Sequence, residues 1–444
     1  MGKTIRLKKG YNIKIEGAAS NTSITDYVSP TYAIKPTDFF GIAPIPKLIP
    51  NIGDEVKAGD PLFYDKTNPS WVYSSPVSGE VVEQKRGPKR RVEEVVIMAD
   101  SNQQYRDFGR LDASASKAEV EQRLLESGCW QFIRQRPFNV TANPADTPKA
   151  VFISGFDTSP MAPDYAVVMK GREADFQAGV NALSKFASVH VSTPTGASIP
   201  AYQNLSGAEV HSFSGPHPAG NVGVQIHHID PIKKGEVVWT VNPQDVLIIG
   251  KLMNEGIFDA TRIITVGGPT AINPGYFRVK QGVNVKDLIG DAEHSRVISG
   301  DVLSGTKINN DGFLGFYDTQ LSVVEEGDSY EMFGWLLPSY PRPTRSRSLI
   351  GSFLRNKPFK VNTNTHGEHR AFVVSGQYED VLPMDVYPVH LIKAILANDF
   401  DGMEGLGIYE VVEEDLALCE FVCTSKQSVQ ATLRDGLDYM REQA

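Results

Sequence analysis

Two short apolar runs, AVFIS at Ala150–Ser154 and VHVS at Val189–Ser192, decide the class of fold. Each has the length of a buried strand, and the stretch between them carries an amphipathic pattern from Arg172 to Phe186. The apolar residues of that pattern recur at helical spacing and are Phe176, Val180, Leu183 and Phe186. A strand, a helix and a second strand in this order predict a parallel, Rossmann-like sheet.

The stretch before this sheet, EVEQRLLESGCWQFIRQRPF at Glu119–Phe138, supplies a candidate ligand site. Its apolar spacing predicts a helix that Gly128 ends in a left-handed turn, and Pro137 then forces an extended exit. The expected loop after the helix carries aromatic and cationic side chains, namely Trp130, Phe132, Arg134, Arg136 and Phe138. Such a set suits a flat ligand with carbonyl oxygens, because rings stack on it and guanidinium groups donate to the oxygens. The alternative is that Trp130 and Phe138 are core anchors and the arginines pair with acidic residues.

Two strand-pair patterns occupy the N-terminal part of the chain, GDEVKAGDPLF at residues 53–63 and SPVSGEVV at residues 75–82. Their turns occur at the spacing of the two halves of a biotinyl/lipoyl-carrier barrel, which this part of the chain therefore resembles. The modified lysine of a carrier would fall near Asn68, and the neighbouring Lys66 lacks the usual flanking residues. We therefore expect an unmodified structural module.

The remainder of the chain predicts a small β-grasp (SLBB-like) domain from residue 256, a connector rich in proline and arginine at Pro338–Ser348, and amphipathic helices from Tyr387. The expected fold class is thus α/β multidomain. The expected divisions are 1–112 for the carrier-like β module, 113–255 for the Rossmann-like domain, 256–335 for the β-grasp domain, 336–386 for the connector and further strands, and 387–444 for a helical C-terminal domain.

Several classes of function are excluded by what the sequence lacks. A net charge of -9 argues against a general nucleic-acid binder. No GxGxxG or GxxxxGK[ST] motif indicates a nucleotide, and no apolar stretch is long enough to span a membrane.

The basic hairpin at Lys85–Arg91 is either a solvated tip or a contact for an acidic partner or anionic lipid.

Histidine and cysteine positions do not indicate a metal site. His211, His217, His227 and His228 cluster without an HExxH or a two-histidine-plus-carboxylate spacing, so we interpret them as structural. His217 stands apart because it lies between two prolines in a glycine-rich turn. We expect no catalytic residue and no metal ligand in this chain.

Five motifs carry a resemblance to a known family. They are ESGCW at Glu126–Trp130, RQRPF at Arg134–Phe138, SGPHPAG at Ser214–Gly220, FGW at Phe333–Trp335, and DLALCEFVC at Asp415–Cys423. With these motifs in this order, the chain resembles the NqrA family of the sodium-translocating NADH:quinone reductase over nearly its whole length. The resemblance implies a peripheral subunit on the cytoplasmic side of the bacterial inner membrane, held by membrane subunits among the other five subunits. It implies ubiquinone as a possible substrate, with Trp130, Phe132, Arg134, Arg136, Phe138 and His217 as candidate quinone-binding residues.

The resemblance extends more distantly to the flavoprotein of complex I, whose glycine-rich loop approaches the flavin phosphate. This chain has the bulky residues 129–138 in the corresponding place, which implies that flavin binding is lost. Cys419 and Cys423 are too few for an iron–sulfur cluster and are expected in the core. The resemblance thus implies that FMN, FAD and iron–sulfur centres belong to other subunits and that this chain binds no cofactor. Its own role is either quinone binding or a non-catalytic scaffold that caps the membrane subunits.

Overall fold

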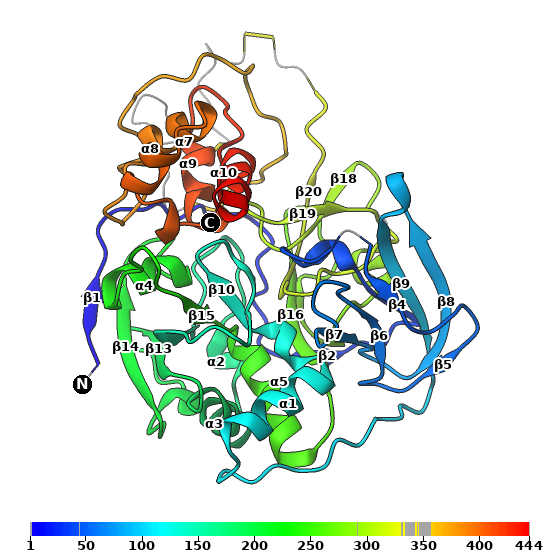
Figure 1. Cartoon of the computed structure of the whole chain (residues 1–444). Coiled ribbons are helices and arrows are strands. Elements are labelled where there is room, and N and C mark those ends of the chain that lie inside the picture. Colours follow the sequence, from blue (N-terminus) through cyan, green and yellow to red (C-terminus); the bar gives the residue numbers. More distant parts are fainter. Residues whose placement is uncertain are drawn as a thin grey trace.

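The computed structural model of this chain describes residues 2–43, 45–290, 292–329, 332–333, 342–343, 345 and 357–443. It has a barrel-sandwich domain, an α/β domain, a β-grasp domain and a group of C-terminal helices (Figure 1). The expected connector Pro338–Ser348 lies outside the described residues apart from Arg342, Pro343 and Arg345, and so does Trp335 of the FGW motif.

The α/β domain contains the predicted parallel sheet. In spatial order its strands are β1 (Thr4–Arg6), β14 (Ala208–Ser214), β13 (Ser188–Pro194), β12 (Ala150–Ser154), β15 (Val238–Thr240), β10 (Arg134–Arg136) and β11 (Val140–Thr141). The first five run parallel, β10 pairs antiparallel with β15, and β11 pairs antiparallel with β10. The Rossmann-like class predicted from the two apolar runs is confirmed.

Helices cover both faces of this sheet, because alternate residues of each strand point to opposite faces. Val151 and Ile153 of β12 pack in the same apolar cluster as α3 (Glu173–Leu183) and α5 (Pro243–Glu255), whereas Phe152 packs with α4 (Val222–Ile229). The domain also contains α1 (Lys117–Ser127) and α2 (Tyr165–Val168). As predicted, Gly128 ends α1 with a φ of 78°.

The barrel-sandwich domain consists of two small antiparallel sheets. One contains β3 (Thr31–Ile34), β9 (Val92–Ala99), β8 (Gly79–Arg86) and β5 (Glu55–Val56), and the other contains β4 (Lys47–Leu48), β6 (Pro61–Tyr64) and β7 (Val72–Ser74). Lys66 is exposed in the turn between β6 and β7. The predicted carrier-like fold is therefore present.

The β-grasp domain is one mixed sheet with a short helix. Its strands in spatial order are β19 (Thr306–Ile308), β18 (Ser295–Ser299), β20 (Gln320–Glu325), β16 (Thr261–Gly267), β17 (Gly275–Lys280) and β2 (Ile24–Asp26), and its helix is α6 (Lys286–Ile289).

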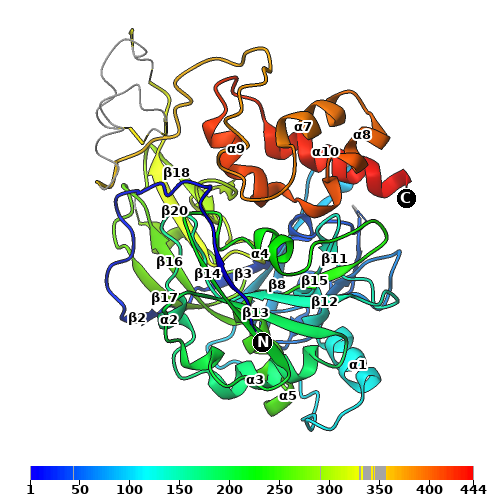
Figure 2. The same ribbon diagram turned by 90° about the vertical axis from the view of Figure 1, so that its left-hand side faces the viewer.

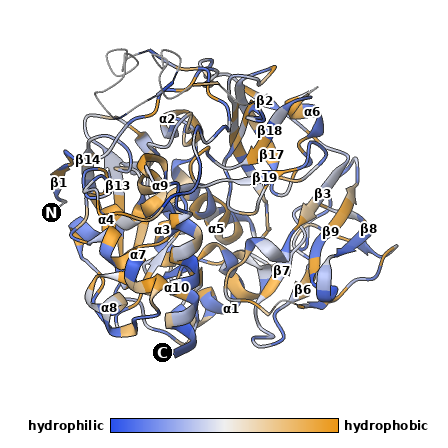
Figure 3. Cartoon of the chain, turned by 90° about the horizontal axis from the view of Figure 1, so that it is seen from above, coloured by the Kyte–Doolittle hydropathy of each residue, from blue (hydrophilic) through white to orange (hydrophobic). Residues whose placement is uncertain are grey.

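The C-terminal helices pack against the α4 side of the α/β domain (Figure 2). They are α7 (Pro388–Leu396), α8 (Phe400–Gly405), α9 (Ala417–Val422) and α10 (Val429–Gln443). Much of α10 is drawn as hydrophilic whereas α5 is mostly apolar (Figure 3), as expected of a surface helix and a buried one. Within the described ranges, no helix is long and apolar enough to cross a membrane.

The described residues also form short 3-10 helices in the barrel-sandwich domain, the α/β domain and the C-terminal region. They are η1 (Pro36–Asp38), η2 (Pro88–Arg90), η3 (Cys129–Phe132), η4 (Pro200–Tyr202), η6 (Ile408–Glu410) and η7 (Glu413–Leu416).

The structure differs from the expected divisions at three places. β1 pairs with β14 and therefore belongs to the sheet of the α/β domain, and β2 pairs with β17 and therefore belongs to the β-grasp sheet. Neither strand belongs to the N-terminal module. Residues 134–136 form the strand β10 where a loop was expected, because they pair with β15. The strands expected in 336–386 are missing from its described part, where Phe359 and Asn362 form only isolated bridges.

Candidate functional site

A cavity of about 880 Å³ lies where the order of the parallel strands reverses. From β12 the chain moves outward to β13 and β14, and then returns to place β15 on the other side of β12. In open α/β sheets, ligands bind at the carboxyl ends of the strands at such a switch point. Asp157 follows β12 and Asn242 follows β15, and both line the cavity. The barrel-sandwich domain, the β-grasp domain and the C-terminal helices supply the other walls.

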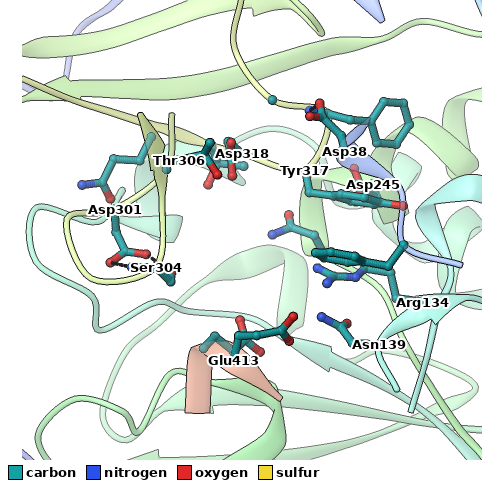
Figure 4. Close-up of a pocket in the computed structure, with 18 of the residues that line it drawn as sticks. Asp38, Arg134, Asn139, Asp245, Asp301, Ser304, Thr306, Tyr317, Asp318 and Glu413 are labelled. Carbon is teal, nitrogen blue, oxygen red and sulfur yellow. Dashed lines mark hydrogen bonds between the residues drawn. The ribbon is translucent and has the colours of Figure 1, made fainter. Parts of the chain in front are cut away.

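Arg134 is a cationic group of this cavity. Its guanidinium carbon lies 4.8 Å from the centre of the Tyr317 ring. Among the residues that the structure describes, no hydrogen bond or ion pair engages this guanidinium. Figure 4 shows Arg134, Tyr317 and Asp245 on one side of the open space, with Asp301 and Ser304 across from them. Unengaged guanidinium donors beside an aromatic face can bind a flat ligand that carries oxygen acceptors.

Arg136 lines the same cavity, but its two terminal nitrogens are engaged in an ion-pair group. Its guanidinium is 1% exposed and donates to Asp415 Oδ2 at 2.8 Å and to Glu414 Oε1 at 2.7 Å. This group joins β10 of the α/β domain to η7 of the C-terminal helices. The alternative interpretation, in which an arginine of this stretch pairs with acidic residues, thus describes Arg136.

Gly223 in α4 makes room for this ion pair, and Gly223→Ala tests that contact. A Cβ atom at this position would lie 2.3 Å from both Arg136 Nη1 and Asp415 Oδ2. Glycine to alanine inside a helix usually stabilises a protein by up to about 1 kcal/mol. Here we expect the opposite sign, a loss of about 1–3 kcal/mol in the free energy of unfolding from overpacking, measured by urea denaturation. Gly405→Ala in α8 is the control, because nothing lies within 4 Å of its Cβ position; equal effects of the two substitutions would refute the close contact.

Three of the six predicted site residues lie outside the cavity lining. Trp130 is fully buried, donates from Nε1 to the Ala142 carbonyl oxygen at 2.7 Å and packs edge-on against Trp239. Phe138 packs edge-on against Tyr409. His217 is 4% exposed, and its Nδ1 lies 3.1 Å from Thr158 Oγ1. The structure therefore brings together Phe132, Arg134 and Arg136 and separates the other three from them.

The apolar wall of the cavity is an aromatic stack in front of a buried ion pair. Phe132 stacks on Phe316 with ring centres 5.3 Å apart, and the Arg262 guanidinium lies 5.7 Å from the Phe132 ring centre. Arg262 forms an ion pair with Asp245, a cavity residue at the start of α5. Burial raises the pKa of Asp245 to about 6, although Arg262 and Arg134 oppose the shift. The cavity thus has a carboxyl group that can carry a proton close to neutral pH.

Asp38, another carboxyl group of the lining, makes stability depend on pH. Burial raises its pKa from 3.8 to about 6, against the opposing effects of Lys35 and the Phe316 backbone N–H. Between these values the folded chain holds a proton that the unfolded chain has released, so the contribution of this group to stability falls as pH rises from about 4 to about 6. We expect Asp38→Asn to be more stable than the original chain at pH 8, by at most about 3 kcal/mol, and to lose this advantage by pH 4. Urea denaturation at both pH values measures the difference, with the exposed Asp435→Asn as control; a constant difference would contradict the assignment.

The three cysteines are buried, as predicted for Cys419 and Cys423. Burial raises the pKa of Cys129 to about 12 and also raises that of Cys419. Both thiols therefore stay protonated at neutral pH.

Sequence reasoning missed several other residues that line the cavity with Arg134. Asp245 and Asn242 lie at the carboxyl end of β15, and recognising Val238–Thr240 as a strand would have indicated them through the switch-point rule. Tyr317 and Asp318 come from a β-grasp loop with no pattern that predicts a site.

The four parts and their shared switch-point cavity define a multidomain α/β protein with a candidate ligand cavity. Family profiles described as "NqrA N-terminal barrel-sandwich hybrid domain", "NqrA second alpha/beta domain" and "NQRA C-terminal domain" match residues 5–100, 115–258 and 263–310. The chain belongs to the NqrA family of the Na(+)-translocating NADH-quinone reductase, as the resemblance of its motifs implied.

Whole-length relatives are named as members of the same family. The A subunit of the Na(+)-translocating NADH-quinone reductase from Neisseria meningitidis serogroup A is 38% identical over 451 residues, which cover 99% of this chain and 100% of the relative. The protein of the same name from Yersinia pestis is 36% identical with the same coverage. Among solved structures, an NAD+-reducing [NiFe]-hydrogenase matches 67% of this chain and 55% of its own with 12% identity and a TM-score of 0.34, which is too weak to support an inference.

Proposed function

We propose that this chain is the quinone-binding subunit of a Na(+)-translocating NADH-quinone reductase and that its switch-point cavity holds the quinone head group. The names of the relatives supply the class of reaction and the quinone. The observation that carries the assignment to the cavity is the guanidinium of Arg134, which lies over the Tyr317 ring with its donors unengaged among the described residues.

The chemistry of a quinone matches these side chains. Its head group is a flat ring with two carbonyl oxygens, so it can pack against the aromatic wall that includes Tyr317 while Arg134 donates to one oxygen. Reduction to the quinol adds two electrons and two protons, and negative charge develops on the oxygens. A fixed guanidinium stabilises that charge, and Asp245, with a pKa of about 6, can hold a proton in the same cavity.

The rest of the complex completes the reaction. We infer that the other five subunits hold the FMN, FAD and iron–sulfur centres that carry electrons from NADH, that this chain binds none of them, and that ubiquinone is the substrate. Sodium export needs a membrane path, which belongs to the membrane subunits. Those subunits hold this chain peripherally on the cytoplasmic side of the bacterial inner membrane.

The scaffold alternative makes a different use of the same residues. In a scaffold without a ligand, Arg134 would anchor a protein interface. The structure favours the ligand because Arg134 lines a cavity with Tyr317 and Asp245.

Calorimetric titration of the purified chain with a water-soluble short-chain ubiquinone tests the proposal. We expect binding of one quinone per chain to a protein without visible absorption. Absence of binding heat at several temperatures would leave the chain as a scaffold, and a yellow or brown protein would contradict the absence of a cofactor.

A further inference from the structure

A second cluster of polar side chains lies on the α/β sheet away from the cavity lining. His190 of β13 is the register partner of Glu209 of β14, and His211 follows two residues later on β14. Because residues two apart on a strand point to the same face, all three side chains lie on one face of the sheet. The Phe152 ring stacks on His190 at 5.0 Å and identifies this face as the α4 side.

Three potential ligand atoms of this cluster lie near the spacing that a metal site requires. His190 Nδ1 lies 3.0 Å from His211 Nε2, and Glu209 Oε2 lies 3.8 Å and 3.9 Å from these two nitrogens. Zinc takes nitrogen and oxygen ligands at about 2.0–2.2 Å, which puts neighbouring ligands of a tetrahedral site roughly 3.3–3.5 Å apart. Small side-chain movements therefore bring all three atoms to the required distances.

Burial is graded across the cluster. The side chain of His211 is 2% exposed, that of His190 is 14% exposed, and that of Glu209 is 39% exposed. An ion held by the three would be closed on the sheet side, and Glu209 would be its most exposed ligand.

We propose that His190, Glu209 and His211 form a binding site for one divalent transition-metal ion of the zinc class. Two imidazoles and one carboxylate are a donor set that such ions prefer, and the carboxylate offsets part of the charge of the ion. The prediction that the histidines of this region are structural did not consider His190, whose position opposite Glu209 depends on the register of β13 and β14.

Two hydrogen bonds of His211 show which ring nitrogen carries its proton and how that proton must move when a metal binds. The backbone N–H of Lys3 donates to His211 Nδ1 at 3.0 Å, so the ring proton of neutral His211 is on Nε2 and points to His190 Nδ1. A metal bound to Nε2 requires that proton to move to Nδ1, with no net proton release. His211 then no longer accepts from Lys3, and the start of β1 loses one bond to the sheet.

Zinc titration of the chelator-treated full-length chain by calorimetry tests the site. We expect one Zn²⁺ per chain and at least a tenfold weaker affinity in both His190→Gln and Glu209→Gln. Substitution of the exposed His390, far along the chain on α7, is the matched control and should leave the affinity unchanged. Circular dichroism and thermal unfolding verify that each variant is folded.

Two further readouts separate the proposed site from adventitious binding. Co²⁺ should give the visible absorption of a four-coordinate ion in the original chain but not in His190→Gln. Hydrogen exchange at the Lys3 amide should become faster when Zn²⁺ is added. No Zn²⁺ binding, or binding of equal affinity in His190→Gln and Glu209→Gln to that of the original chain, would overturn the proposal.

Discussion

Replacing Arg136 by alanine is expected to lower the free energy of unfolding by about 3–5 kcal/mol, the largest effect on stability that we predict. Arg136 is 1% exposed and Asp415 is 0% exposed, so the substitution leaves a buried carboxylate without its cation. The same change removes the bond to Glu414 and with it the ionic link between β10 and the C-terminal helices. The shift of the urea midpoint, followed by circular dichroism, measures the loss.

Arg441→Ala is the matched control for Arg136→Ala. Arg441 pairs with Asp438 at 3.9 Å and is 35% exposed, and such a pair contributes about 0–1 kcal/mol. A second control replaces both partners, Arg136→Met with Asp415→Leu, and is expected to cost less than Arg136→Ala alone because no buried charge is left unpaired. Equal losses in Arg136→Ala and Arg441→Ala would contradict the role assigned to the buried group.

Arg134→Ala is expected to weaken the binding of a short-chain ubiquinone by about 10- to 100-fold, the largest effect on binding that we predict. A hydrogen bond to a charged group contributes about 1.5–3 kcal/mol, which corresponds to this range. The fold should be retained, since the described structure gives the guanidinium a contact with the Tyr317 ring and no hydrogen bond. Calorimetric titration of the folded variant measures the change.

Arg106→Ala is the control for Arg134→Ala. The Arg106 guanidinium carbon lies 4.9 Å from the centre of the Phe108 ring, which is the same kind of contact outside the cavity lining. We expect no change in quinone affinity for this variant. Arg134→Lys keeps the charge but not the forked donors and should fall between Arg134→Ala and the original chain. Unchanged quinone affinity in Arg134→Ala would show that the quinone site lies elsewhere.

The sequence predicted those parts of the fold that depend on local patterns. The apolar runs of β12 and β13, the helix between them and the left-handed Gly128 are each encoded within a few residues. The partners of β1 and β2 could not be predicted, because a three-residue strand contains no pattern that identifies a distant edge. β10 could not be predicted for the same reason, because it forms a strand only through its pairing with β15.

The candidate site was predicted only in part for the same reason. Arg134 stood out because aromatic residues and arginines alternate after α1, but the alternation could not separate lining residues from core residues. Trp130 and Arg134 are four residues apart in the sequence, yet Trp130 is fully buried against Trp239 and Arg134 lines the cavity. Tyr317 reaches Arg134 through domain packing, which no local pattern encodes.

Mapping a photoreactive azidoquinone on the assembled complex tests the central claim most directly. After illumination and proteolysis, the proposal predicts label on peptides of this chain that contain residues 132–139 or 315–318, and excess ubiquinone should compete with the label. Arg134→Ala in the complex should reduce this labelling. Label confined to other subunits, or to peptides of this chain that do not line the cavity, would contradict a quinone site at the switch point.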